Sequence, residues 1–359
     1  MSQSEVDTAK KSLFSYFKAL PKAELHLHME GAIRPEMLLK LAERNHLRLP
    51  FSCPDQWGDQ CNFKSFDDFA KALLMGVGCL RQLEDFFDLI VDLGSALADQ
   101  NIRYAEVTWT PQFYLNREYP LDALLRALED GRSQVKSQFG IEMRWIPDLV
   151  RSYPGPSMAV ANWASSPNSR SAGVVALGLG GPEAGHPAAT FCAQFQHARS
   201  HGLPANPHAG EGMGPESVWE TIQYLQPTRI GHGVRAAESD ALVKYLADHE
   251  IPLEVCLTSN IKLGIFPSYA EHPLKKLFDA GCKVTINSDD PVLFKTTLTE
   301  EYVHAVSDCD LSIRDVQTTI LESIRASYLP EAEKVSMQAT FISEFSELDR
   351  RFAPFPLAP

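Results

Sequence analysis

Four short segments of the chain combine histidine and acidic side chains at spacings that suit metal chemistry. His26 and His28 are one residue apart in AELHLHMEG, His208 stands three residues before Glu211 in HAGE, and NSDDP contains Asp289. Residues i and i+2 of a strand point to the same side, so His26 and His28 project together if this run is extended. Three imidazoles with one carboxylate suit zinc better than calcium or magnesium, which prefer oxygen ligands. The sequence therefore predicts one zinc ion per chain, held by His26, His28, His208 and Asp289.

Two further side chains stand beside these segments and suit proton transfer. Glu211 follows His208, and a carboxyl group held near a metal in a water-poor pocket can act as a general acid. His232 lies between two glycines in GHG, where the backbone can approach other groups closely. Taken alone, Glu211 could favour a helix N-terminus, and His232 and the DDP segment could be turn residues. Their combination with the metal set favours a general-acid role for Glu211, and His232 is a further candidate residue of the site.

These segments share a position, because each stands at or near the end of an apolar run that could be a buried parallel strand. Eight such runs alternate with longer amphipathic stretches, at 23–29, 103–111, 143–150, 173–181, 204–211, 229–234, 252–260 and 283–291. Eight strand–helix units predict an α/β fold, a (β/α)8 TIM barrel. The carboxyl ends of its strands meet at one mouth, which would gather these histidines and acids. A doubly wound sheet is the alternative, but no GxGxxG follows the first strand.

The remaining organisation indicates a single domain over residues 1–359. Roughly seventy residues separate the first two strands, more than one helix needs, and 63–100 is typical of at least two helical segments. We expect this helical insertion, at about 50–100, to lie over the barrel mouth as a lid. Amphipathic runs at 120–139 and 238–250 predict helices. The tail at about 350–359 holds three prolines and is expected to be irregular.

Composition limits the partners and the compartment. The net charge of −13 disfavours a protein that binds nucleic acid, and no apolar run approaches the length of a membrane helix. The N-terminal segment lacks the apolar stretch of a signal peptide. The seven cysteines are odd in number and form no CxxC, which fits a reducing cytosol and disfavours a Cys53–Cys61 pair. We therefore expect a cytoplasmic protein that binds a small molecule, without nucleic-acid or membrane partners.

The segments LHLHMEG, HAGE, GHG, CLTSN and NSDDP, in this order and spacing, resemble the adenosine deaminase family of metal-dependent amidohydrolases. The resemblance runs from about residue 20 to 300. It implies a TIM barrel with one bound zinc and a hydrolase that attacks the exocyclic amine of an adenine ring. Hydroxide bound to the zinc, available because the metal lowers the pKa of water, would give the 6-oxo purine and ammonia.

The resemblance also implies individual roles around the purine. His26, His28, His208 and Asp289 match the zinc ligands. Glu211 resembles the general acid that protonates ring nitrogen N1, and His232 the histidine that orients the hydroxide. Asp290 resembles the carboxyl that contacts N7, and Gly181 the glycine whose backbone NH meets N3. The phenylalanines of FDDFAKAL fall where the family has a hydrophobic gate.

The residue at position 30 leaves the identity of the substrate undetermined. Glu30 stands where animal-type adenosine deaminases have an aspartate that contacts the ribose 5′-hydroxyl. Glutamate there also occurs in relatives that act on free adenine or on aminodeoxyfutalosine, a nucleoside with a large 5′ substituent. CLTSN is more similar to the nucleoside-acting branches than to CPLSN of adenine deaminases. The sequence thus predicts adenosine or deoxyadenosine as substrate with Glu30 as a sugar contact, and aminodeoxyfutalosine or adenine as alternatives.

Two other functions are disfavoured. A non-catalytic binding protein with this fold would have lost a metal ligand or Glu211, and all are present. Metal-dependent hydrolases of other substrates usually bridge two metals with a carboxylated lysine on a middle strand. The corresponding run, GVVALGLGG, contains no lysine, which favours a single metal.

Overall fold

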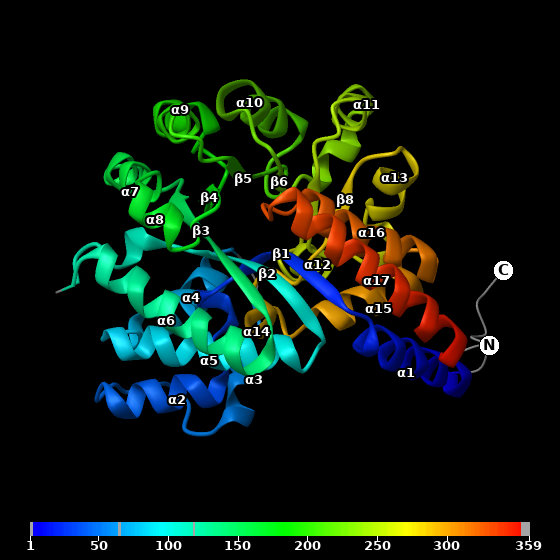
Figure 1. Cartoon of the computed structure of the whole chain (residues 1–359), viewed down its shortest axis with the longest axis horizontal. Helices are drawn as coiled ribbons and strands as arrows, with labels where there is room; N and C mark the ends of the chain where they lie inside the picture. Colours follow the sequence, from blue (N-terminus) through cyan, green and yellow to red (C-terminus); the bar gives the residue numbers. More distant parts are fainter. Residues whose placement is uncertain (1–2, 64–65, 118, 353–359) are drawn as a thin grey trace.

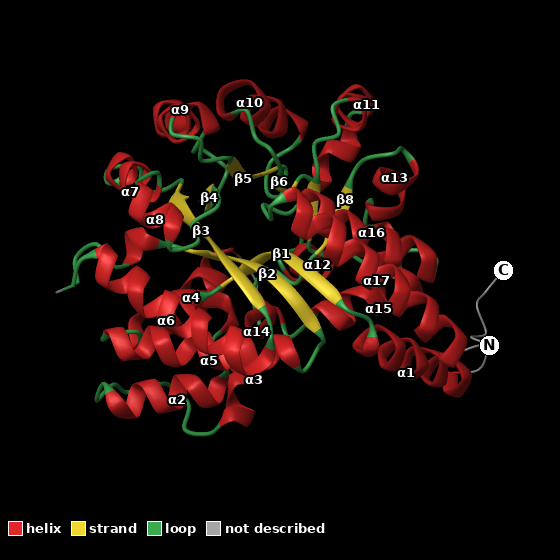
Figure 2. Ribbon diagram, in the orientation of Figure 1, coloured by secondary structure: helices red, strands yellow, loops and turns green. Residues whose placement is uncertain are grey.

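The computed structural model describes residues 3–63, 66–117 and 119–352, and its centre is a sheet of eight parallel strands (Figures 1 and 2). Neighbouring strands follow the sequence order from β1 to β8. Their bounds are β1 Lys22–His28, β2 Ile102–Trp109, β3 Glu142–Val150, β4 Leu177–Gly180, β5 Ala205–Ala209, β6 Ile230–His232, β7 Leu253–Val255 and β8 Val284–Ile286. Each strand coincides with one of the predicted apolar runs, so the expectation of eight buried parallel strands is confirmed.

The segment that follows β8 joins β1 and brings the sheet to a nearly closed barrel. The His28 amide donates to the Asp289 carbonyl over 2.8 Å, and the Asp289 amide donates to the His26 carbonyl over 3.1 Å. The side-chain oxygen of Asn287 accepts from the amides of Leu25 and His26 at 2.9 and 3.2 Å. These bonds satisfy β1 donors that would lack a partner at an open sheet edge. The predicted (β/α)8 architecture is therefore confirmed.

Helices surround the barrel and cover the outer face of the strands (Figure 2). α1 (Gln3–Ala19) precedes β1 and contacts α15 and α17. The helices after β2 are α6 Leu121–Phe139, α7 Ser157–Ala164, α8 Pro167–Ser171, α9 Cys192–Ser200, α10 Pro215–Leu225, α11 Asp240–Asp248, α12 Leu257–Lys262, α13 Leu274–Asp279, α14 Pro291–Phe294, α15 Leu298–Ser307, α16 Ile313–Ala326 and α17 Glu331–Phe352. The helices expected at 120–139 and 238–250 are α6 and α11.

Local sequence signals set several helix ends. α6 ends at Gly140, whose φ of 74° is the left-handed conformation that glycine adopts readily at a helix C-terminus. α16 begins after Ser312, whose hydroxyl accepts from the Asp315 amide at 3.1 Å while the Asp315 carboxylate accepts from the Ser312 amide at 2.8 Å. This reciprocal capping satisfies two amides that the helix itself leaves unpaired.

The insertion between β1 and β2 contains α2 (Pro35–Arg44), α3 (Trp57–Gln60), α4 (Phe66–Cys79) and α5 (Leu83–Ala98). The expectation of at least two helices in 63–100 is confirmed by α4 and α5. α4 reaches the barrel through Phe69, whose ring stacks on Phe294 of α14 with centroids 5.2 Å apart. α5 packs closely on α6, because a Cβ at Gly94 would lie 2.3 Å from the Val135 side chain. α4 is thus held against the barrel between β1 and the helices that follow β8.

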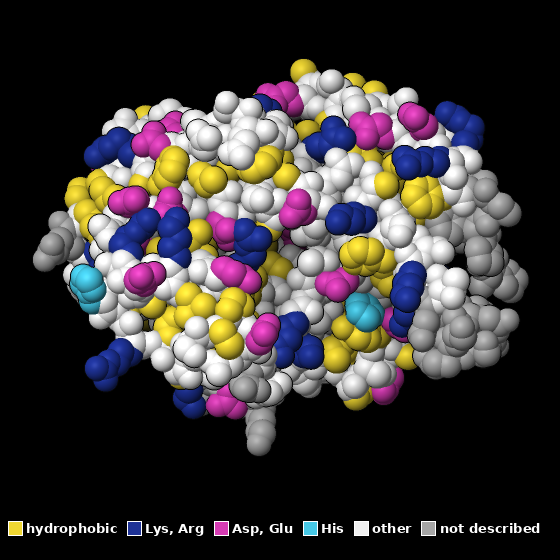
Figure 3. Space-filling view, turned by 90° about the horizontal axis from the view of Figure 1, so that it is seen from below, with side chains coloured by type: hydrophobic (Ala, Val, Ile, Leu, Met, Phe, Trp, Pro, Cys, Tyr) yellow, Lys and Arg dark blue, Asp and Glu magenta, His cyan; other side chains and the backbone are white. Residues whose placement is uncertain are grey.

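The C-terminal residues, the cysteines and the surface complete the description. Residues 350–352 belong to the last turn of α17, whereas the rest of the expected irregular tail, 353–359, lies outside the described residues. All seven cysteines have free thiols, Cys53 and Cys61 included. Within the described ranges, no helix is both long and apolar enough to cross a membrane. Figure 3 shows a face of the molecule on which acidic and basic side chains are interspersed.

Candidate active site

The predicted metal ligands converge at the carboxyl ends of their strands. Asp289 Oδ1 lies 3.4 Å from both His26 Nε2 and His28 Nε2, and His28 Nε2 lies 3.2 Å from His208 Nε2. All four donor atoms lie within 4.8 Å of one another. Ligands about 2.0–2.1 Å from a tetrahedral zinc ion are about 3.3 Å apart, so the spacing fits such an ion. Among the described residues, His26 Nε2 is buried without a hydrogen-bond partner, which also indicates a place for a cation.

The protonation states of His28, His208 and Asp289 favour metal binding. Burial lowers the pKa of His28 to about 4 and that of His208 well below its ordinary value, so both imidazoles offer lone pairs at neutral pH. Burial alone would raise the pKa of Asp289, but the His26 ring 3.4 Å away and the nearby histidine charges hold it well below the usual range. Burial opposes protonation of His26, yet Asp289 and Glu254 raise its pKa well above 6.5. A bound cation would replace the proton between His26 and Asp289.

A chain of buried charges orients His26 from behind. Glu254 of β7 lies with Oε2 2.9 Å from His26 Nδ1. The same oxygen accepts from the side-chain NH2 group of Asn206 at 3.3 Å. The other Glu254 oxygen accepts from Arg229 Nε at 2.6 Å, and Arg229 also forms an ion pair with Glu106 of β2. These charged side chains are at most 2 % exposed. A carboxylate on the outer nitrogen of a metal-binding histidine fixes its tautomer and ring orientation.

Glu211 is placed by a loop that Glu183 organises. The carboxylate of Glu183 accepts from the amides of Gly210, Glu211 and Gly212 at 2.9, 2.9 and 2.8 Å. The Glu211 side chain points to the metal set, with Oε1 3.7 Å from His232 Nε2. Burial, with the charges of Asp289 and Glu183, raises the pKa of Glu211 to about 8. The carboxyl group therefore carries a proton at neutral pH, as a general acid requires.

His232 occupies a backbone conformation that the two neighbouring glycines make possible. Its φ of 57° lies in the left-handed region, as does that of Asp289 at 64°. A Cβ at Gly231 would lie 2.9 Å from His26 and 3.1 Å from His208, and one at Gly233 would lie 2.5 Å from Leu253. The GHG motif thus allows the close approach that the sequence indicated. Left-handed non-glycine residues cost free energy and gather at functional sites.

The metal set lies at the floor of a cavity of about 200 Å³ at the barrel mouth. Its polar lining includes Glu211, His232, Asp290 and the backbone of Gly181. Its apolar lining comes largely from α4 and nearby loops, namely Phe66, Phe69, Leu73, Leu74, Phe113, Leu263 and Phe294. The phenylalanines of FDDFAKAL therefore border the cavity, at the place the resemblance gave to a hydrophobic gate.

The three expected substrate contacts have different surroundings. Asp290 lines the cavity, and burial with the charge of Asp289 raises its pKa well above the ordinary value. A Cβ at Gly31 would lie 1.7 Å from Asp290 Oδ1, so Gly31 makes room for this carboxyl. Gly181 also lines the cavity and has a φ of 90°. Both residues stand where a purine could reach them.

The Glu30 carboxylate contacts Thr110 and Tyr114. Its Oε1 accepts from the Thr110 amide at 2.9 Å and the Tyr114 hydroxyl at 3.1 Å, and the residue is 4 % exposed. A strand that continued to residue 30 would project Glu30 beside His26 and His28, but β1 ends at His28 and Glu30 begins a 3-10 helix. A direct contact between Glu30 and a sugar stays a prediction, and the observed bonds favour a bracing role.

Several polar residues of the site were assigned no role from the sequence. They are Glu106, Asp148, Glu183, Arg229, Glu254, Asn260 and His272. Asp148 of β3 lines the cavity, and its Oδ1 is buried with no hydrogen-bond partner in the part of the chain that the structure describes. A Cβ at Gly178 would lie 1.8 Å from this oxygen, so the glycine gives Asp148 its space. An acidic residue within the apolar run MRWIPDLV was the only available sign of Asp148.

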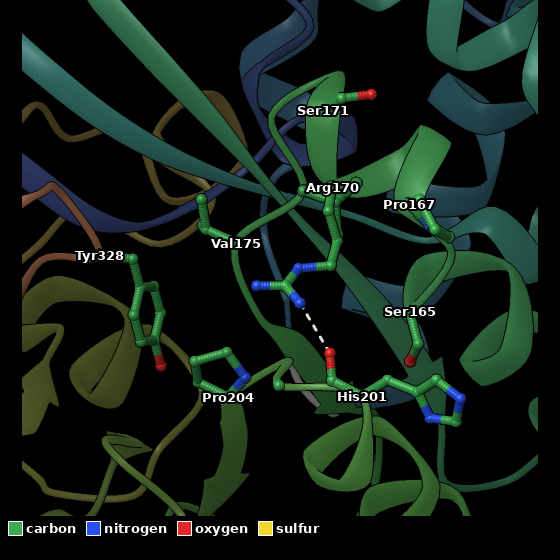
Figure 4. Close-up of a pocket in the computed structure, with 10 residues that line it drawn as sticks. Ser165, Pro167, Arg170, Ser171, Val175, His201, Pro204 and Tyr328 are labelled. Atoms are coloured by element: carbon green, nitrogen blue, oxygen red, sulfur yellow. Dashed lines mark hydrogen bonds between the residues drawn. The ribbon is translucent and has the colours of Figure 1, made fainter.

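A second hollow lies at the opposite end of the barrel (Figure 4). It is larger, about 690 Å³, and is lined by Val175 and Pro204, which precede β4 and β5, and by Tyr328. Arg170 spans it and donates to the His201 carbonyl at 2.6 Å. Enzymes of the barrel fold use the carboxyl ends of the strands, so the smaller cavity at the mouth is the candidate active site.

A barrel with three histidines and one aspartate gathered at its mouth defines a metal-dependent hydrolase of the amidohydrolase type. The sequence model of the family described as Adenosine deaminase matches residues 21–343. The chain belongs to the adenosine deaminase family, and it is accordingly a purine deaminase, a metal-binding hydrolase of the C–N bond. The resemblance inferred from the motifs is confirmed.

Named relatives and solved structures refine this assignment. The chain is 38% identical to an aminodeoxyfutalosine deaminase of Streptomyces avermitilis over 92% of each chain. It is 36% identical to an adenine deaminase of Crocosphaera subtropica over 88% of this chain and 96% of the other. An adenine deaminase structure from Arthrobacter aurescens superposes with a TM-score of 0.85 at 28% identity, covering 92% and 99% of the chains. A Burkholderia ambifaria amidohydrolase with bound zinc gives 0.85 at 26%, covering 95% and 94%.

Proposed function

We propose that this protein is a zinc-dependent deaminase of a 6-aminopurine, and that its substrate is aminodeoxyfutalosine. The observation that carries the chemistry is the convergence of the metal set, the protonated Glu211 and His232 on one cavity. The zinc-bound relative from Burkholderia ambifaria supports zinc as the ion for the same fold. In the reaction a C6–O bond forms, the C6–N bond breaks, and ammonia leaves with the 6-oxo purine as the other product.

The residues that line the cavity act on different atoms of the purine and on the attacking oxygen. Zinc, when bound, supplies hydroxide near neutral pH by lowering the pKa of water. Glu211 gives its proton to ring nitrogen N1, which offsets the loss of aromaticity as C6 becomes tetrahedral. Burial and the charge of Asp289 raise the pKa of Asp290, which favours the protonated form, and that form donates a hydrogen bond to N7. The Gly181 amide donates to N3, and His232 orients the attacking oxygen.

Two observations support a substrate with a large 5′ substituent. Relatives named aminodeoxyfutalosine deaminases, from Streptomyces avermitilis and Streptomyces coelicolor, are 38% and 37% identical to the chain. Phe66 and Leu74 of α4 border the cavity and remain 37% and 49% exposed. Large apolar side chains at the edge of a polar site suit an apolar ligand group that covers them. An apolar 5′ substituent would cover Phe66 and Leu74 when the purine reaches the metal.

Free adenine is the second candidate. One carboxylate oxygen of Glu30 already accepts two protein hydrogen bonds, and the cavity of about 200 Å³ is small. Relatives named adenine deaminases are 36% and 37% identical to this chain. Adenosine and deoxyadenosine, the first expectation from the sequence, have less support because the relatives described above carry the other two names.

A deamination screen tests the proposal. The zinc-loaded protein is assayed for ammonia release from aminodeoxyfutalosine, adenine, adenosine and deoxyadenosine under identical conditions. We expect the highest kcat/KM on aminodeoxyfutalosine. A higher value on adenine would replace the substrate but keep the chemistry, whereas no ammonia from any of the four would reject the proposed function.

A further inference from the structure

Two buried residues outside the predicted site form a chain of hydrogen bonds that ends on His232. Asn260 lies on α12, and His272 lies just before α13. His272 Nε2 is 3.0 Å from Asn260 Oδ1, and Asn260 Nδ2 is 3.2 Å from His232 Nδ1. Asn260 is fully buried and His272 is 5% exposed, so water does not compete for these bonds.

A backbone amide fixes which atoms donate and which accept in this series of hydrogen bonds. The Leu274 amide donates to His272 Nδ1 at 3.1 Å, and a backbone N–H is always a donor. His272 Nδ1 must therefore be the lone-pair nitrogen, and the single proton of the neutral ring lies on Nε2. Burial lowers the pKa of His272 to about 3, which keeps the ring neutral.

The orientation of the Asn260 side chain and the proton position of His232 follow from the proton on His272 Nε2. His272 Nε2–H donates to Asn260, so the carbonyl oxygen of that amide faces His272 and its NH2 group faces His232. The Asn260 NH2 group donates to His232 Nδ1, which has to accept. The proton of the neutral His232 ring consequently lies on Nε2. That nitrogen faces the cavity, 3.7 Å from Glu211 Oε1 and 3.7 Å from Asp289 Oδ2.

We propose that His272 and Asn260 are positioning residues that hold His232 as its Nε2–H tautomer. His232 then donates a hydrogen bond to the water oxygen that attacks C6 and does not take the proton of that water. This inference rests on the proposed function, because it assigns His232 a role in the same reaction. It gives the asparagine of CLTSN and the histidine of EHP a function that acts through His232.

Nitrogen-15 NMR of histidine in the zinc-loaded wild-type protein tests the tautomer directly. We expect His232 and His272 to be neutral at pH 7, each with its proton on Nε2. A His232 with the proton on Nδ1, or on both nitrogens, would overturn the proposal. This measurement needs no substrate, so its result stands even if the protein deaminates none of the purines tested.

The Asn260→Asp variant tests the coupling. A carboxylate accepts from both rings, so a proton should appear on His232 Nδ1. Because the proton then leaves His232 Nε2, which can no longer donate to the attacking oxygen, we expect kcat to fall about 10²-fold with little change in KM and in zinc content. Phe266→Leu is the matched control, because the Phe266 ring packs on His272 at 5.0 Å without entering the hydrogen-bond chain.

The kinetics of Asn260→Asp and Phe266→Leu, compared with each other, either support or overturn the proposal. A fall in kcat for Asn260→Asp, with kcat kept in Phe266→Leu, supports the proposal. An unprotonated His232 Nδ1 in Asn260→Asp, an unchanged kcat, loss of zinc, or an equal loss of kcat in Phe266→Leu would each overturn it. If Asn260→Asp does not fold, the wild-type tautomer alone decides.

Discussion

Asp289 and His28 are joined twice, once through the backbone and once through their side chains. The His28 amide donates to the Asp289 carbonyl at 2.8 Å, which closes the barrel, and Asp289 Oδ1 lies 3.4 Å from His28 Nε2. The residue that completes the sheet therefore also completes the metal set. Binding of the metal is expected to stabilise the seam between the first and last strands.

Zinc should accordingly raise the thermal stability of the protein. A ligand that binds only the folded state at 100 times its Kd adds about 2.7 kcal/mol to the free energy of unfolding. Calorimetry of the chelated and the zinc-reconstituted protein measures this difference. Asp289→Ala, which removes one ligand, should show little further stabilisation by zinc. Equal Tm values for the chelated and reconstituted wild type would show that no structural coupling exists.

Glu211→Gln should keep the metal and the fold but lose most of the rate. The amide fills the same space but cannot give a proton to N1, so kcat should fall by ~10²–10⁴. Steady-state kinetics together with metal analysis measure both properties in one preparation. Near-normal turnover in Glu211→Gln would remove Glu211 from the mechanism.

The rate should depend on pH through the same carboxyl group. Burial raises the pKa of Glu211 to about 8, so the group is protonated below that pH and loses its proton above it. The protonated form is the general acid, and kcat should therefore be constant near neutral pH and fall as the pH rises past about 8. A pH profile of kcat checks this, and the alkaline fall should be absent from the residual activity of Glu211→Gln.

Glu30→Ala should reduce stability and affect every substrate alike. The change leaves the buried Thr110 amide and Tyr114 hydroxyl without their acceptor, at a cost of about 1–3 kcal/mol. Denaturant unfolding measures that loss, and Tyr114→Phe, which removes only the hydroxyl, is the smaller matched change. A loss of activity confined to nucleosides, with free adenine unaffected, would instead establish Glu30 as a sugar contact.

The apolar edge of the cavity should affect only the substituted substrate. Leu74 is 49% exposed beside the cavity, and Leu74→Ser should raise KM for aminodeoxyfutalosine about fivefold through loss of about 1 kcal/mol of apolar contact. The KM for adenine should not change. Ile342→Ser, at a residue of α17 with a similar exposure of 51%, is the control for solubility effects. Equal changes for both substrates would argue against a 5′ substituent lying on α4.

The eight strands and the metal set could be predicted because their signals are local. His26 and His28 share the two-residue period of one strand, and each other ligand stands at the end of an apolar run that the barrel brings to the mouth. Glu30 shows the limit of this reasoning, since the chain leaves the strand at His28 and the period no longer holds.

The residues that orient the site could not be found in this way. His272 reaches His232 through Asn260, and these residues come from the loop before α13, from strand β6 and from α12. Glu254 contacts His26 across the barrel from a strand far along the sequence. Such pairs depend on how loops and strands pack, and no spacing in a single sequence records them.

The most direct test is a zinc titration of the metal-free protein, with ammonia release from aminodeoxyfutalosine and adenine measured at each step. We expect the chelated protein to be inactive and its activity to rise in proportion to added zinc up to one ion per chain. Full activity in the metal-free protein, or none after one zinc is bound, would contradict metal-dependent deamination at this site.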